Sequence, residues 1–174
     1  MTMQFIASAT LGSTANAIDF NSIPQTFTHL QVRFFIRSQA ANNDFSIGVN
    51  GSFSISNCAS HALVGNGSSA LSGAWTSANF VSLTNPVNLV PSFPSNSVGS
   101  GIIDILDYTN TNKNKTIRVL WGSDQNGAGF VALNSGFFAT TSAISAVNFF
   151  NGFNWAAGTR FDLYGITTST VTGA

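Results

Sequence analysis

The chain is very poor in charged residues. Glutamate is absent, and Asp, Lys and Arg together make up 7% of the 174 residues, with six acidic side chains balancing six basic ones. An ordinary soluble domain carries about 25% charged residues. Nucleic acids and anionic lipids select surfaces with clustered Lys and Arg, so neither is expected as a partner. Low charge also gives little protection against self-association, which indicates that neighbouring molecules cover much of the surface.

Cysteine and histidine are scarce as well. Cys58 has no second cysteine with which to form an intramolecular disulfide, and His29 and His61 are the only imidazoles, too few for a histidine-rich metal site. Cys58 and His61 are close in the sequence, but a nucleophile pair would need them in hydrogen-bond contact, with a third group orienting the imidazole. A buried or idle thiol is the better interpretation. We expect no catalytic, cofactor-binding or metal-binding residues.

Acidic motifs do not change this expectation. Asp104 and Asp107 are three positions apart, which on a strand places them on opposite faces of a sheet, so they are not expected to act as a carboxylate pair. Segment 124–129, DQNGAG, has a weak likeness to a calcium loop but lacks the closing Glu, and is interpreted as a hairpin turn. No phosphate-binding or nucleophile-elbow motif occurs in a suitable context. The protein is therefore not expected to be an enzyme.

Long hydrophobic runs are missing too. None approaches the roughly 20 residues that span a bilayer. The stretch MTMQFIASATLGS at the start of the sequence has neither a basic region nor a continuous apolar region, so it does not predict a signal peptide. We expect synthesis in the cytoplasm and no membrane partner.

Strand-forming residues dominate what is present. Ser, Thr, Asn, Gly, Val and Ile are abundant, sixteen residues are Phe, and no apolar residues recur at helical spacing for three turns. In 29–37, every second side chain is apolar and is expected to face the core: Leu30, Val32, Phe34 and Ile36. In 160–166, RFDLYGI, Phe161 and Leu163 are expected to face inward. Gly165 takes the next inward position, where a neighbouring backbone or ring comes close. Further strands are expected at 3–10, 15–20, 45–49, 101–108, 117–121, 129–140 and 142–150.

About eight to ten short strands separated by turn signals predict one all-β domain, 1–174, with an antiparallel two-sheet sandwich or barrel. Between 57 and 100 the alternation dissolves around GNGSS and PSFP, so this range is predicted to be a long, irregular, loop-rich insertion that has room for short strands around 79–82 and 87–89. Residues 167–174 are predicted to be a C-terminal tail. The regular pattern of 160–166 indicates that the last strand pairs deep in a sheet, beside early strands.

Two features indicate a contact surface. Segments 101–108 and 142–150 carry apolar residues on both faces, so each lies beneath another layer of the domain or against another subunit. A group of aromatic residues surrounds Gly152, and such rings can anchor a protein interface, stack on sugars, or form a hydrophobic plug at one end of the sandwich. The candidate interface residues are Phe35, Tyr108, Phe149, Phe153, Trp155 and Tyr164.

Several segments together resemble a group of small virion proteins of tailed bacteriophages. The matching parts are 6–12 (IASATLG), 18–30 (IDFNSIPQTFTHL), 105–116 (ILDYTNTNKNKT), 142–144 (SAI), 163–166 (LYGI), Arg33 and Arg37. The resemblance covers both ends of the chain and leaves about 57–100 unmatched. Phe27 and His29 stand where members tend to have Tyr and Asp.

The resemblance implies a β-sandwich of jelly-roll type and a structural role on a virion, without enzymatic activity. We expect a capsid decoration, or cement, protein that binds the major capsid protein and stabilises the head. The alternative is a tail-fibre or receptor-binding module that recognises a host surface glycan. Self-association as a homotrimer is expected because virion lattices offer three-fold positions.

Overall fold

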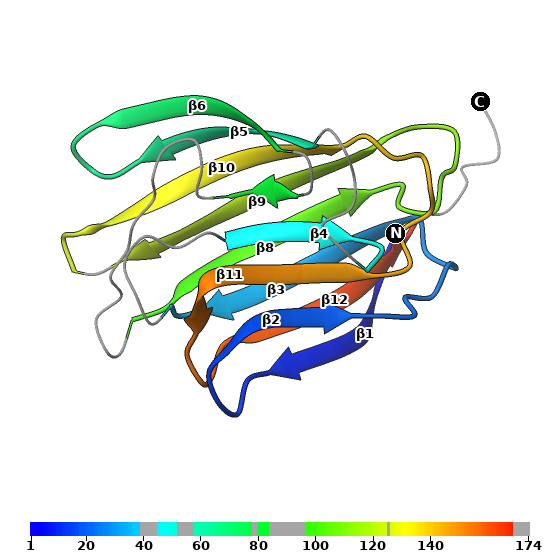
Figure 1. The fold of residues 1–174 in the computed structure, drawn as a ribbon, viewed down its shortest axis with the longest axis horizontal. Helices are drawn as coiled ribbons and strands as arrows, with labels where there is room; N and C mark the ends of the chain where they lie inside the picture. The colour runs from blue at the N-terminus through cyan, green and yellow to red at the C-terminus, as the bar shows by residue number, and fades with distance from the viewer. Residues whose placement is uncertain (39–44, 52–57, 78–79, 84–96, 125, 169–174) are drawn as a thin grey trace.

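The computed structural model describes residues 1–38, 45–51, 58–77, 80–83, 97–124 and 126–168. In these residues the chain forms two antiparallel sheets and no helix, and therefore no helix that could cross a membrane (Figure 1). The large sheet has the order β1 (Thr2–Thr10), β12 (Arg160–Thr167), β3 (His29–Ile36), β8 (Gly99–Leu106), β9 (Lys115–Asp124), β10 (Gly129–Phe138), β5 (Cys58–Gly65) and β6 (Ala70–Ser77). The small sheet has the order β2 (Ala15–Phe20), β11 (Val147–Trp155), β4 (Phe45–Val49) and β7 (Val81–Ser82). The predicted all-β sandwich of antiparallel strands is confirmed.

The small sheet lies in front of the large one in Figure 1. Aromatic rings pack between the two sheets. Phe45 of β4 is central, with its ring centroid 5.3 Å from that of Phe34 and 5.8 Å from that of Trp155. Phe149 of β11 stacks on Phe161 of β12 at 4.4 Å. Large aromatic side chains bury much apolar area each, and edge-to-face or offset arrangements add to this. This aromatic layer holds the two sheets together.

The strand expected at 29–37 has the predicted polarity. Leu30, Val32, Phe34 and Ile36 are 0–3% exposed, whereas Phe35 is 51% exposed on the opposite face. Alternating apolar residues therefore assign the faces of β3 correctly.

The last strand also pairs as expected. β12 lies between β1 and β3, with Tyr164 opposite Phe5 on one side and Gln31 on the other. Its Gly165 faces inward, and a Cβ there would lie 2.3 Å from the ring of Phe27. The expected close approach of a ring at this glycine is confirmed.

The middle of the chain is more ordered than predicted. Strands β5, β6 and β7 lie within 57–100, so the prediction of an irregular insertion is wrong for 58–77, whereas β7 falls where a short strand was expected, around 79–82. With these three strands, the described residues form twelve strands, more than the expected eight to ten. Residues 84–96 of the same range lie outside the described residues. Hairpin β5–β6 continues the large sheet beyond β10 (Figure 1). β5 pairs antiparallel with β10, with Cys58 opposite Phe138, and β6 pairs antiparallel with β5, with Ala70 opposite Gly65.

Two element ends also differ from expectation. The strand predicted at 142–150 begins at Val147 and continues to Trp155, and 142–146 is a connection rather than a strand. Thr167 closes β12, and most of the predicted tail, 169–174, lies outside the described residues.

Candidate functional site

The outer face of the large sheet carries a row of apolar side chains. Because directly paired residues of neighbouring antiparallel strands point to the same face, the strand register defines which side chains adjoin. Ile102 lies opposite Leu120, Leu120 opposite Leu133, and Leu133 opposite Leu63. These four residues, from β8, β9, β10 and β5, are 37–55% exposed, and we call them the apolar row. A row of large apolar residues across four strands is a surface suited to a protein contact.

The same register continues from the apolar row into a charged region. Ile102 lies opposite Arg33 of β3, and Arg33 lies opposite Asp162 of β12. Arg160 donates a hydrogen bond to Asp162 over 2.8 Å, and the Arg33 guanidinium lies 5.6 Å from the centre of the Tyr164 ring. The charged side chains of this region are therefore positioned by contacts with one another and with Tyr164, within the same subunit.

Asp162 is buried beneath these contacts. Burial by itself would raise the pKa of its carboxyl, but the hydrogen bonds from Arg160 and Ser8 hold that pKa below its usual value. Asp162 is therefore charged at neutral pH, and its charge is satisfied within the subunit.

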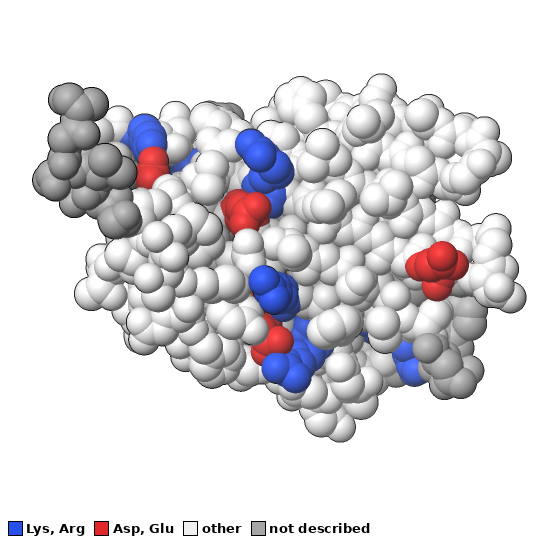
Figure 2. All heavy atoms as spheres, turned by 180° about the vertical axis from the view of Figure 1, so that it is seen from behind, with Lys and Arg blue, Asp and Glu red and all other residues white. Residues whose placement is uncertain are grey.

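Figure 2 looks onto this face from behind, and the two halves differ clearly. Charged side chains gather over one part of the face, whereas a broad area without charge extends toward β10, β5 and β6. None of these three strands contains Asp, Glu, Lys or Arg. The uncharged half contains Leu63, Leu133 and the exposed Val131, whereas Leu120 lies at its border, because Arg118 and Asp124 share the outer face of β9 with it.

The six predicted interface residues separate into two groups. Phe35 and Tyr164 lie on the outer face of the large sheet, and Phe153 of β11 is 50% exposed. Tyr108, Phe149 and Trp155 are at most 1% exposed and belong to the core, so they are not available to a partner. Trp155 was expected in a loop because the strand was expected to end at 150.

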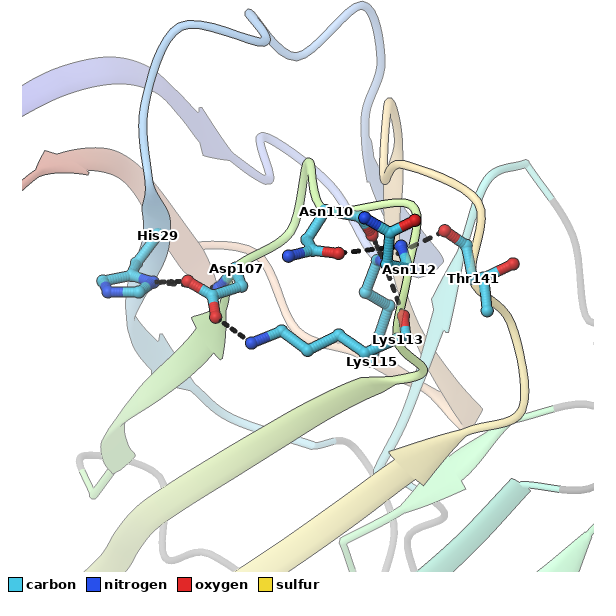
Figure 3. Close-up of polar contacts among 7 residues, drawn as sticks. All are labelled: His29, Asp107, Asn110, Asn112, Lys113, Lys115 and Thr141. Atoms are coloured by element: carbon cyan, nitrogen blue, oxygen red, sulfur yellow. Dashed lines mark hydrogen bonds and ion pairs between the residues drawn. The ribbon is translucent and has the colours of Figure 1, made fainter.

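The segment between β8 and β9 is fixed by the buried Lys115 (Figure 3). Its Nζ donates hydrogen bonds to the carbonyl oxygens of Lys113 at 3.1 Å, Thr141 at 3.2 Å and Asn110. Burial lowers the pKa of Lys115, and the charge of Lys113 lowers it further. Lys115 thus joins the β8–β9 loop to the connection between β10 and β11.

Asp107 forms a second contact of this loop. Its carboxylate pairs with Lys113, and this hydrogen bond holds the pKa of Asp107 below its usual value. Its backbone N–H donates to Nδ1 of His29 over 2.9 Å, so this nitrogen acts as an acceptor (Figure 3). Asp104, in contrast, accepts a hydrogen bond from Gln31 on the outer face. The two carboxylates therefore have separate structural partners.

Cys58 and His61 lie on opposite faces of β5. The Cys58 side chain is buried in the core, and burial raises the pKa of its thiol to about 11. His61 points to the outer face, where it pairs in register with Ser135. A thiol that stays protonated and lies across the sheet from the imidazole cannot form a nucleophile pair with it.

Segment 124–129 and a groove beside Val131 are two further places where a metal ion or a small molecule could bind. Within the described residues no group of three or more metal-binding side chains occurs. Segment 124–129 joins β9 to β10; residue 125 lies outside the described residues, and Asp124 accepts a hydrogen bond from the Asn126 N–H. A shallow groove of about 570 Å³ adjoins Val131 between the turns at 65–67 and 127–130. Asp124 is the only ionisable residue that lines it, so the groove lacks converging catalytic groups.

Sequence reasoning missed the apolar row as a unit. Ile102 was recognised as apolar on a two-faced strand, but Leu63 lay in the range expected to be irregular. No family model, curated protein or solved structure matches the chain.

Proposed function

We infer that the sandwich is a jelly roll with two added hairpins. In a jelly roll of eight strands, the first strand pairs with the last, the second with the seventh, the third with the sixth and the fourth with the fifth, and these four pairs fall alternately in the two sheets. Leaving aside β5–β6 and β9–β10, the chain has the pairs β1–β12, β2–β11, β3–β8 and β4–β7. The two sheets are then β1-β12-β3-β8 and β2-β11-β4-β7, as nested pairing requires.

We propose that the protein is a structural component of a tailed-bacteriophage virion, a capsid decoration protein that binds the major capsid protein and stabilises the head. The resemblance of segments 6–12, 18–30 and 105–116 to virion proteins motivates this assignment. The jelly-roll pairing is compatible with it, because this architecture recurs in viral capsid domains.

The observation that carries the proposal is the apolar row on the uncharged half of the outer sheet face. Four exposed aliphatic side chains in register form a continuous strip that water solvates poorly, and a neighbouring protein would remove it from water. Among the adjoining charged residues, Arg160 pairs with Asp162, and Arg33 donates a hydrogen bond to Gln31 and lies over the ring of Tyr164, so they add orientation at the rim rather than attraction. A subunit of this kind acts by binding, without chemistry.

A tail module that binds glycans is the competing function. It depends on aromatic rings presented by 149–155, and of these Phe149 and Trp155 are buried. The proposal for the head is favoured for this reason. Copies are proposed to associate with one another as well, around the three-fold positions of the lattice.

Labelling of intact virions with an antibody against the protein tests the location. The proposal expects label over the whole head at hundreds of copies per particle. Label confined to the tail at a few copies per particle would contradict it and favour the glycan-binding module.

A further inference from the structure

The two sheets have four edge strands, and three of them are protected against pairing with another strand. β7 has only two residues, and β1 has a break in its register between Phe5 and Ala7. β2 carries the charged Asp19, and its pairing with β11 shifts register between Phe150 and Trp155. Short length, bulges and charges are the devices by which proteins prevent association at sheet edges.

The fourth edge, β6, carries none of these devices. Its eight residues, ALSGAWTS, include no charge and no proline. They pair with β5 in an unbroken register from Gly65 opposite Ala70 to Cys58 opposite Ser77. Among the described strands none lies beyond β6. An edge strand of this length presents unpaired backbone N–H and C=O groups in an extended conformation, which is a template for another strand.

We propose that β6 pairs antiparallel with β6 of a second copy, across a two-fold axis perpendicular to the sheet. A second copy is the occupant that fits because the edge is neutral and does not repel itself. A two-fold contact also closes after two copies, whereas a contact between different edges can continue into a fibre. The result is one continuous sheet of sixteen strands, eight from each copy.

The side chains of β6 fix the register of this contact. Facing residues must lie on the same side of the sheet, so the axis passes beside a residue of β6, and the longest overlap of two Ala70–Ser77 strands places it beside Gly73 or Ala74. With the axis at Gly73, Leu71 of each copy lies opposite Trp75 of the other on the inner face. Leu71 is exposed, and Trp75 is half-buried against Phe80 at 5.3 Å. An aromatic–aliphatic cross-strand pair stabilises a sheet.

The same register causes no steric conflict on the outer face. Ser72 would lie opposite Ala74 of the second copy, and Ala70 opposite Thr76, so all these side chains are small. With the axis at Ala74, Trp75 would face Gly73 and lose its aliphatic partner. The contact therefore centres on Gly73.

This contact uses only the edge of β6, so it is independent of the proposed virion role. It is also compatible with a further contact through the apolar row.

Disulfide cross-linking of the purified protein tests the contact and its register. In the proposed pairing the two copies of residue 73 face each other with Cα atoms about 4.5–5.5 Å apart, within the roughly 4.4–6.8 Å that a disulfide spans. Gly73→Cys is expected to form a covalent dimer on mild oxidation. Ala74→Cys is the matched control, because residue 74 faces residue 72 and its own copy is about 8 Å away. Wild type, whose Cys58 is buried, is expected to remain uncross-linked.

Sedimentation of edge variants gives a second measurement that needs no cysteine. Ala74→Lys places two like charges at the contact, and it is expected to lower the sedimenting mass because the β6 contact is lost, while Ala74→Ser keeps the wild-type mass. Efficient cross-linking of Ala74→Cys in place of Gly73→Cys would overturn the proposed register. An unchanged mass for Ala74→Lys would overturn the pairing of β6, even if Gly73→Cys did not fold.

Discussion

Leu120 of β9 and Leu133 of β10 lie directly opposite each other on the outer face of the large sheet, and they are 55% and 46% exposed. A cross-strand apolar pair contributes about 0.2–1 kcal/mol to a sheet, which is small compared with the burial of a core side chain. Ile102 and Leu63 extend the pair to both sides. Such a row on a solvent-facing sheet indicates that the surface is covered in the assembled state.

Replacing both leucines separates association from folding. In Leu120→Ser/Leu133→Ser, we expect weaker association and a loss of folding stability of about 1 kcal/mol or less, because both side chains are already solvated in the subunit. Val119→Ser is the control on the same strand: Val119 is fully buried, so this variant should lose about 2 kcal/mol or more. Denaturant melts and sedimentation measure the two effects. A large loss of stability in the leucine variant without a change in mass would contradict the assignment.

Association of the purified protein should persist at high salt. The apolar row contains no charge, and β6 contains none either. At 1 M salt the Debye length is about 3 Å, so a contact that depended on charge would weaken. Sedimentation at low and high salt should give the same mass. Dissociation by salt alone would show that charge holds the copies together, and a stable monomer at micromolar concentration would contradict association altogether.

Phe34 and Phe35 are neighbours that point to opposite faces of β3. Phe34→Ala leaves a cavity between Phe45 and Phe161, whose ring centroids lie 5.3 and 5.6 Å from that of Phe34, and should cost about 3–5 kcal/mol. Phe35 is half exposed, so Phe35→Ala should cost much less in the isolated subunit. Denaturant melts of the two variants measure the difference. Equal losses would mean that the face assignment of β3 is wrong.

Lys115 should contribute more to the free energy of unfolding than Lys113, although the side chains of both contact residues of the β8–β9 loop. Lys115→Met removes a buried ammonium group that donates to three partly buried carbonyl oxygens, and should cost about 1–3 kcal/mol. Lys113 is mostly exposed and pairs with Asp107, so Lys113→Met should cost about 0–1 kcal/mol. Thermal or denaturant melts compare the two. If Lys113→Met proved the more damaging, Lys115 would not be the residue that fixes the loop.

Local patterns predicted those parts of the fold in which large apolar residues alternate. In β3 and β12 the inward positions, apart from Gly165, are Leu, Val, Ile and Phe, and both strands were assigned correctly. In β5 three of the inward positions are Cys58, Ser60 and Ala62, and β6 is rich in Ser, Ala and Gly, so their periodicity is weak. Small residues suffice there because pairing with β10, rather than propensity, positions the hairpin.

The candidate surface could be predicted only in part for a different reason. Each member of the apolar row is an ordinary outward residue in its own strand. The row arises from the register between strands as distant in sequence as β5 and β10, and this register is set by the whole sheet. Conversely, Phe149 and Trp155 looked like surface anchors because the sequence around Gly152 resembles a loop, whereas β11 extends through it.

The proposed coverage of the apolar row on a virion can be tested directly by hydroxyl-radical footprinting of the purified protein and of intact particles. Leu63, Leu120 and Leu133 should be oxidised in the dilute purified protein and protected in the particle. The core residues Val119 and Val32 should be unreactive in both. Equal oxidation of the three leucines in both samples would contradict the claim that this face binds the neighbouring capsid subunits.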